Sequence, residues 1–170
     1  MNKEKKILTA ATKEAGEFSK AKIVWLVHPL LEQLAMAFAA YVGMESQTES
    51  GKPLIVAAIK NALAAYSKHE QDERAAIAAF VASLLENSKD VFSQQIVVAT
   101  HKGQILWSPF AGGLAEFLDA YPNAEVTVSR QECKIAESIA KTFMMTKIIP
   151  YTLLDQASLA DLFNTDQLTV

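Results

Sequence analysis

The residues that could carry out chemistry are few and far apart in this sequence. Cys133 is the only cysteine, and the three histidines stand at positions 28, 69 and 101. A nucleophilic cysteine needs a nearby base, and a metal site needs ligands that share one face of an element. His28 and Glu32 have helical spacing, but His28 precedes the predicted helix that holds Glu32. We therefore expect no metal site and no cofactor, and we interpret Cys133 as a small buried side chain on a helix.

Two stretches contain some of the glycines of nucleotide-binding loops. Gly51-Lys52 follows Gly43, but the spacing is wrong for a phosphate loop, and Pro53 replaces the hydroxyl residue that would hold magnesium. Gly112-Gly113 falls inside a predicted helix rather than after a strand, which close helix packing explains. The Gly-x-Ser-x-Gly motif is missing as well. We therefore favour a protein that is not an enzyme, although catalytic groups can converge from distant positions.

One anion-binding candidate and one candidate contact surface remain in the C-terminal half. Ser129 and Arg130 stand at a predicted strand-to-helix junction, where free backbone N–H groups attract anions. Trp107 and Phe110 flank another predicted strand-to-helix corner. Aromatic side chains are frequent both in protein interfaces and in cores. Trp107 ends an apolar strand and Phe110 starts an apolar helix, which favours burial, and partner binding is the alternative.

The segment after residue 150 is a second candidate for partner binding. Its charged side chains are all acidic: Asp155, Asp161 and Asp166. Its apolar candidates lie on a short predicted helix, 158–163, and are Leu159, Leu162 and Phe163. A helix this short has only marginal stability in isolation. We therefore expect it to dock on its own domain or on another chain.

The N-terminal region has the opposite charge balance and a helical pattern. Residues 1–22 contain six lysines and three glutamates, and residues 4–27 form a predicted amphipathic segment. This basic start could instead lie on an anionic membrane surface. The apolar stretch Ile23–Val42 is not a membrane span, because its polar residues interrupt it. It contains a predicted central helix, Pro29–Val42, which is apolar on nearly all sides and therefore buried.

The remaining elements follow from periodicity and turn residues. Helices over 53–66 and 72–86 each carry one apolar stripe and form an antiparallel pair. Beyond residue 88 the pattern predicts a hairpin, alternating helices and strands, and apolar strands buried on both faces. The predicted strands are 95–100, 104–107, 125–128 and 147–149, and the predicted helices are 109–121, 130–145 and 158–163. Ser129 and Glu132 form a capping box for the helix that runs to about Met145.

Composition limits the class of protein. The chain has 170 residues, is 51% hydrophobic and carries a net charge of −3, which fits one globular domain. An acidic protein does not favour nucleic acid, because phosphate binding needs a basic face. A single cysteine is typical of a reducing compartment, so we expect a soluble, cytoplasmic protein without integral membrane insertion.

These patterns predict an α+β fold, predominantly α, in which a helical half packs on a small sheet of order ββαβαβα. We expect one domain over 1–170, with halves 1–90 and 91–170 sharing a core. The leading functional hypothesis is a small non-enzymatic adaptor, chaperone-like or regulatory protein that binds another protein or itself. One alternative is a small enzyme or ligand-binding domain with a site near Ser108, Ser129 and Arg130. The other is a peripheral membrane protein that uses its lysine-rich start.

Overall fold

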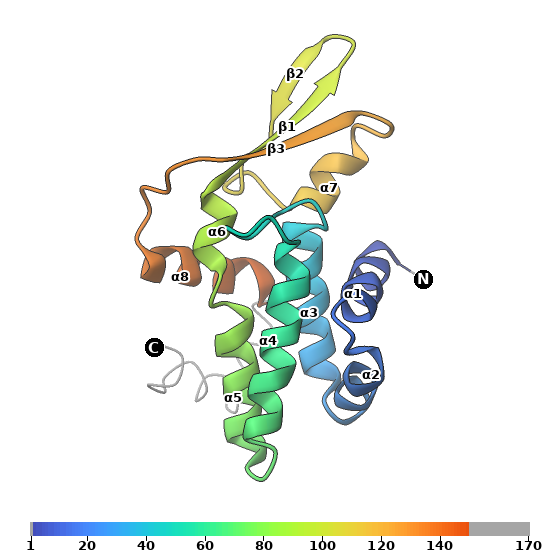
Figure 1. The fold of residues 1–170 in the computed structure, drawn as a ribbon, viewed down its shortest axis with the longest axis vertical. Coiled ribbons are helices and arrows are strands. Elements are labelled where there is room, and N and C mark those ends of the chain that lie inside the picture. The colour runs from blue at the N-terminus through green and yellow to red at the C-terminus, as the bar shows by residue number, and fades with distance from the viewer. Residues whose placement is uncertain (1, 150–170) are drawn as a thin grey trace.

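The computed structural model describes residues 2–149 and shows a helical bundle that carries a small sheet at one end (Figure 1). The helices are α1 (Lys3–Glu14), α2 (Phe18–Val27), α3 (Pro29–Val42), α4 (Leu54–Lys68), α5 (Glu73–Leu84), α6 (Ser88–Phe92), α7 (Leu114–Asp119) and α8 (Glu137–Ile148). The strands are β1 (Gln94–Thr100), β2 (Gly103–Leu106) and β3 (Glu125–Arg130). The fold is α+β and predominantly α, which confirms the predicted class.

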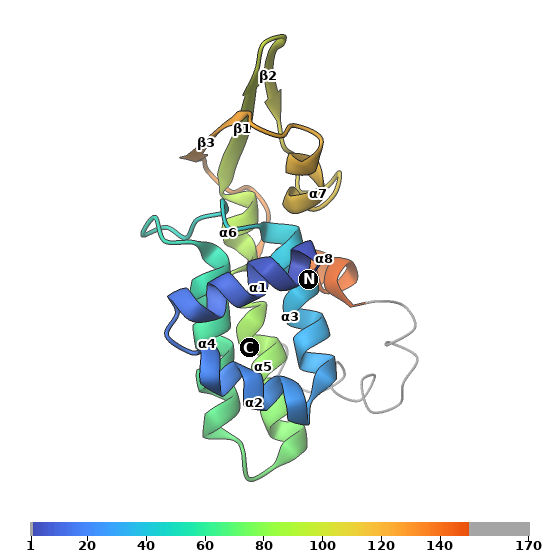
Figure 2. The same cartoon turned by 90° about the vertical axis from the view of Figure 1, so that its right-hand side faces the viewer.

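Helix α3 is the centre of the bundle. It begins at Pro29 and ends before Gly43, as predicted, because proline suits a first helical turn and Gly43 adopts a positive φ of +62°. The helix packs against α1, α2, α4, α5, α7 and α8. Its fully buried large side chains are Leu31, Leu34 and Phe38. The other elements are therefore positioned by a common apolar support (Figure 2).

Helices α4 and α5 form the predicted antiparallel pair and lie side by side in both views (Figures 1 and 2). The Asp72 carboxylate caps α5 by accepting the Ala75 backbone N–H at 3.3 Å. The apolar stripe of α4 includes Ile55, Ile59 and Leu63, which are all fully buried. Helical periodicity was sufficient to predict this pair because each stripe has one face to cover.

The N-terminal segment differs from its prediction. Residues 4–27 form two helices, α1 and α2, rather than one amphipathic segment. The chain turns at Gly16, where φ is +74°, a conformation that interrupts a right-handed helix. The turn allows α1 and α2 to pack separately on α3.

The sheet is antiparallel, with strand order β2-β1-β3. Strands β1 and β2 form the predicted hairpin, which pairs Val98 with Ile105. In β1, Ile96 and Val98 are fully buried, whereas Val97 is only half-buried and Thr127, its partner in β3, is exposed, so only one face of the sheet is fully covered. The prediction that these strands are buried on both faces was therefore wrong.

Three boundaries in the C-terminal half also differ from prediction. The helix expected over 109–121 begins only at Leu114, and the helix expected from 130 begins only at Glu137. Residues 147–149 were predicted as a strand, but α8 continues to Ile148. Ile148 is buried like Met144, one helical turn earlier, so the helix gains apolar contact by continuing. The predicted helix over 158–163 lies outside the described residues.

The buried apolar side chains form one cluster that reaches from the bundle into the base of the sheet. It includes Leu8 of α1, Ile96 of β1, Trp107 after β2 and Ile149 after α8. Whether both halves unfold as one domain stays a prediction. Among the described helices, none has the length and apolar character that crossing a membrane requires.

Candidate protein-binding surface

The loop that follows β2 holds two aromatic residues in different environments. Trp107 is buried, and its indole N–H donates to the Gly112 carbonyl at 3.0 Å. The Tyr41 hydroxyl of α3 donates to the Pro109 carbonyl. A side chain at Gly113 would meet the backbone of α3, 3.3 Å from the Tyr41 Cα, so glycine permits close packing here as the sequence indicated. The loop is therefore fixed to the bundle without being helical.

Phe110 projects from this fixed loop and is 57% exposed. Its ring contacts Phe92 of α6, with centroids 5.1 Å apart, and Phe143 of α8, with centroids 5.2 Å apart. Phe92 and Phe143 also contact each other at 5.5 Å in an edge-to-face arrangement. Two aromatic side chains thus hold Phe110 while more than half of it faces solvent.

A hollow of about 390 Å³ lies beside Phe110. Its apolar lining comes from Phe92, Leu106, Trp107, Phe110 and Ile135. Leu106 is itself 54% exposed, so the hollow opens onto an apolar rim. Lys134 and Glu132 add one charge of each sign to the lining. We call the residues Leu106, Phe110 and Ile135, with the hollow between them, the aromatic surface.

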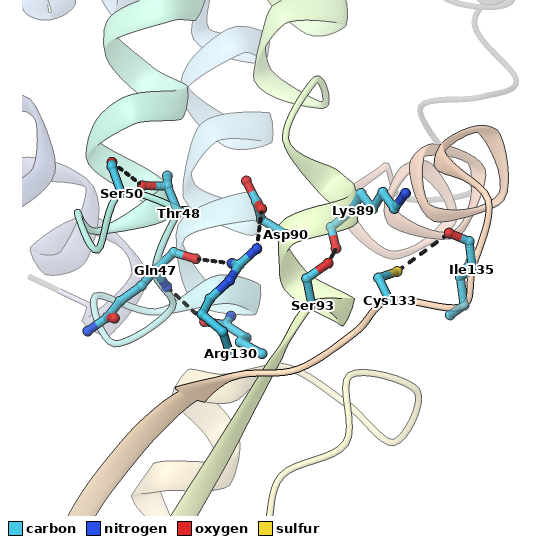
Figure 3. A network of polar contacts seen from close by, with 10 residues as sticks. Gln47, Thr48, Ser50, Lys89, Asp90, Ser93, Arg130, Cys133 and Ile135 are labelled. Carbon is cyan, nitrogen blue, oxygen red and sulfur yellow. Dashed lines mark hydrogen bonds and ion pairs between the residues drawn. The ribbon is translucent and has the colours of Figure 1, made fainter.

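A polar junction joins the sheet to the bundle next to this surface (Figure 3). Arg130 at the end of β3 donates from Nη2 to Asp90 Oδ1 of α6 at 3.3 Å, and from Nη1 to the Gln47 carbonyl at 3.5 Å. The Gln47 backbone N–H donates to Gln94 Oε1 at 2.9 Å. Gln131 donates from its side chain to the Gln94 carbonyl at 3.0 Å. These contacts fix the position of the sheet relative to the loop between α3 and α4.

The anion-binding prediction at Ser129 and Arg130 loses its structural basis. Both residues lie in β3, where Ser129 pairs with Gln95, and α8 begins only at Glu137. The capping box was therefore misread, because strand pairing with β1 holds these residues extended. Arg130 also has a carboxylate partner in Asp90. Anion binding at these two residues stays a prediction.

The residues of the alternative ligand site line two neighbouring hollows. Ser108 lines the hollow beside Phe110, whereas Arg130 lines a polar hollow of about 480 Å³, and Gln131 and Glu132 line both. Cys133 also lines the polar hollow. It is half-buried in the loop between β3 and α8 rather than buried on a helix, and its thiol donates to the Ile135 carbonyl at 3.4 Å. Among residues 2–149, no histidine lines that hollow, so the described part of the chain offers the thiol no imidazole base there.

The histidines lie elsewhere in the fold. His28 is between α2 and α3, with Nδ1 3.8 Å from Glu73 Oε1 and its ring against Tyr66. His101 is exposed in the turn between β1 and β2. Over residues 2–149, no three His, Cys, Asp or Glu side chains gather closely enough to hold a metal ion.

Sequence reasoning missed a second exposed apolar surface, on α2. Ile23 is 66% exposed, Leu26 is 84% exposed and Val27 is 61% exposed. Their spacing of three and four residues places them on one helical face, and we call them the α2 stripe. The spacing was visible in the sequence, but apolar spacing alone does not show whether a neighbour covers the stripe.

Of the predicted partner-binding residues, Trp107 and Phe110 thus line one hollow, and Leu159, Leu162 and Phe163 lie outside the described residues. Comparison of the chain with protein-family models, with curated proteins and with solved structures gives no match.

Proposed function

We propose that this protein acts by binding another protein through the aromatic surface. The observation that carries the proposal is Phe110, an aromatic side chain that is 57% exposed and yet held by Phe92 and Phe143. Association costs free energy when interface side chains become ordered. Phe110 is ordered in advance by its two neighbours, so less of that cost remains. Rigid aromatic side chains beside a pocket are typical of residues that dominate binding energy.

The shape of the surface favours a partner that presents one large apolar side chain. The hollow beside Phe110 measures about 390 Å³ and has an apolar wall formed by Trp107 and Ile135. Lys134 and Glu132 at its edge would contact polar groups around the inserted side chain. A mixed rim around an apolar centre matches the usual anatomy of protein interfaces. In this proposal the protein is a non-enzymatic adaptor or regulator in the cytoplasm.

Site-specific photocrosslinking tests the proposal. A photoreactive phenylalanine derivative replaces Phe110 in the full chain, and the matched control carries it at Gln71, which is exposed in the turn between α4 and α5. When cells that produce these variants are irradiated, we expect a covalent crosslink between position 110 and one partner protein, and none from position 71. A second change, Leu106→Glu, should abolish this adduct because it places a charge on the apolar rim.

The captured partner is then purified and titrated against the unmodified chain. Phe110→Ala should weaken binding by about tenfold or more, as expected for a hot-spot aromatic residue. Gln71→Ala should leave the affinity unchanged. Equal adducts at positions 110 and 71, or none at either, would rule out this surface. If adducts form only between copies of this chain, the result would contradict a separate partner protein and indicate that the surface mediates self-association.

A further inference from the structure

A second hollow lies between α1 and α2, away from the aromatic surface. It measures about 360 Å³, and its apolar lining includes Leu8, Ala21 and Trp25. Leu26 of the α2 stripe lines it too, and its side chain is 84% exposed. The hollow and the stripe thus form one continuous apolar strip along α2. We call this strip, with its lining from α1, the α1–α2 groove.

The charges around the groove are mainly positive. Lys5 and Lys22 line it from α1 and α2, and among the described residues Glu32 of α3 is the one acidic side chain that lines it. Lys13 and Lys22 place their ammonium groups 5.1 Å and 5.4 Å from the centre of the Phe18 ring, which also lines the groove. An apolar centre with a basic rim selects an acidic segment that carries large apolar side chains.

We infer that the occupant is the acidic segment 155–166 of the same chain. Leu159, Leu162 and Phe163 follow the three- and four-residue spacing that lets side chains share one face of a helix. Asp155 stands four residues before Leu159, and Asp166 stands three residues after Phe163. Helical spacing would place these two carboxylates at the two ends of the apolar face. Residues 151–170 contain no basic residue that would be repelled by Lys5 and Lys22.

The chain is long enough to make this contact. The segment follows α8, and both α8 and α2 pack on α3 (Figures 1 and 2). A helix with its side chains is about 10 Å across. The five residues 150–154 that connect α8 to this segment span up to about 17 Å when extended, which is more than the width of one helix.

Binding within one chain needs little intrinsic affinity. A tethered segment has an effective concentration in the millimolar range, so a weak contact between separate molecules becomes a well-populated one within the chain. Burial of Leu26 and its neighbours contributes apolar free energy to docking. The carboxylates contribute an electrostatic free energy, which salt weakens. The inference does not depend on the aromatic surface, because the lining residues of the two hollows are different.

Cysteine crosslinking in the full chain tests the inference. In a Cys133→Ser background, one variant combines Thr9→Cys, in the groove lining, with Asn164→Cys in the acidic segment. The control combines Ala64→Cys, exposed on α4, with the same Asn164→Cys. Under dilute oxidising conditions, we expect the disulfide within one chain to form about fivefold faster or more in the first variant, because docking raises the local concentration. Circular dichroism verifies that both variants are folded.

Charge reversal and rescue complete the test. Lys5→Glu with Lys22→Glu should slow the Thr9–Asn164 crosslink, and Asp155→Lys with Asp166→Lys should restore it. Rescue cannot arise from misfolding, because it adds two further substitutions and recovers the rate. Equal rates for the Thr9 and Ala64 variants would overturn the inference. A crosslink that forms mainly between chains, at a rate that rises with protein concentration, would overturn it in favour of the segment of a second copy.

Discussion

The Arg130 guanidinium lies 3.3 Å from the Asp90 carboxylate, and this contact joins the last residue of β3 to α6 (Figure 3). The Asp90 side chain is 22% exposed and that of Arg130 is 40% exposed, so solvent reaches the pair. The same guanidinium donates to the Gln47 carbonyl in the loop between α3 and α4. One side chain therefore links three segments that are distant in sequence.

This pair should contribute a small, salt-sensitive part of the stability. A double-mutant cycle with Arg130→Ala and Asp90→Ala should give a coupling free energy of about 0.2–1 kcal/mol, as solvent-reached ion pairs do. Urea unfolding measures it, and high salt should reduce it because the charges are screened. A coupling free energy above about 2 kcal/mol, unchanged by salt, would show that the pair behaves as a buried one.

Phe80 offers a test of the single shared core. It is fully buried on α5, and its ring meets the Trp25 ring edge-on at 5.8 Å. Phe80→Ala should lower the free energy of unfolding by about 3–5 kcal/mol, the range for large core truncations. Hydrogen exchange should also show lost amide protection in residues 96–99 and 126–128 if the halves unfold together. Lys60→Ala, on the exposed face of α4, is the control and should change stability by less than about 0.5 kcal/mol. If the strands of the Phe80→Ala variant keep native amide protection, the two halves unfold separately and the chain consists of two domains.

Tyr41 should make stability depend on alkaline pH. Burial raises the pKa of Tyr41 to about 12, and its hydroxyl donates to the Pro109 carbonyl. In the unfolded chain a tyrosine ionises near pH 10. The buried hydroxyl stays protonated while the unfolded one ionises, so the contribution of Tyr41 is complete below about pH 10 and is lost as the pH rises towards 12. Urea unfolding across this window should show a steeper loss in the native chain than in Tyr41→Phe. Equal slopes would contradict the raised pKa.

Gly43 and Gly16 form a matched pair of positive-φ glycines. A Cβ at Gly43 would lie 2.8 Å from Glu45 Oε1 and 3.1 Å from Leu114 Cδ2, whereas a Cβ at Gly16 would meet nothing within 4 Å. Gly16→Ala should therefore cost only the backbone strain, about 1–2 kcal/mol. Gly43→Ala should cost more, about 2–4 kcal/mol, because strain and crowding against α7 add. Thermal unfolding compares the two, and a smaller loss for Gly43→Ala would contradict the close approach of α7.

The sequence predicted elements best where local chemistry and burial agree. Helix α3 was predicted to the residue because Pro29, Gly43 and an apolar composition all favour the same boundaries. The start of α8 was wrong because Ser129 and Glu132 have the spacing of a cap, but pairing with β1, a long-range contact, holds Ser129 in β3. A local motif contains no information about a pairing with Gln95, which lies in a distant part of the chain.

The candidate surfaces were harder to predict from the sequence. Trp107 and Phe110 are three residues apart and were treated alike, yet one is buried and the other is 57% exposed. The difference comes from Phe92 and Phe143, which approach Phe110 from one side only, and no local pattern predicts their meeting. The α2 stripe has the spacing of a buried face and nevertheless lies exposed, because α3 supports the opposite face of α2.

The turn between β1 and β2 has a practical consequence for labelling the molecule. His101, Lys102 and Gly103 are exposed, and the hairpin extends away from the bundle (Figures 1 and 2). Lengthening such a turn adds little closure entropy, because that cost grows only with the logarithm of loop length. A short peptide tag or a fluorophore-bearing insert between Lys102 and Gly103 would therefore stand clear of both hollows. The protein can therefore be immobilised or labelled through this hairpin while binding at either surface is measured.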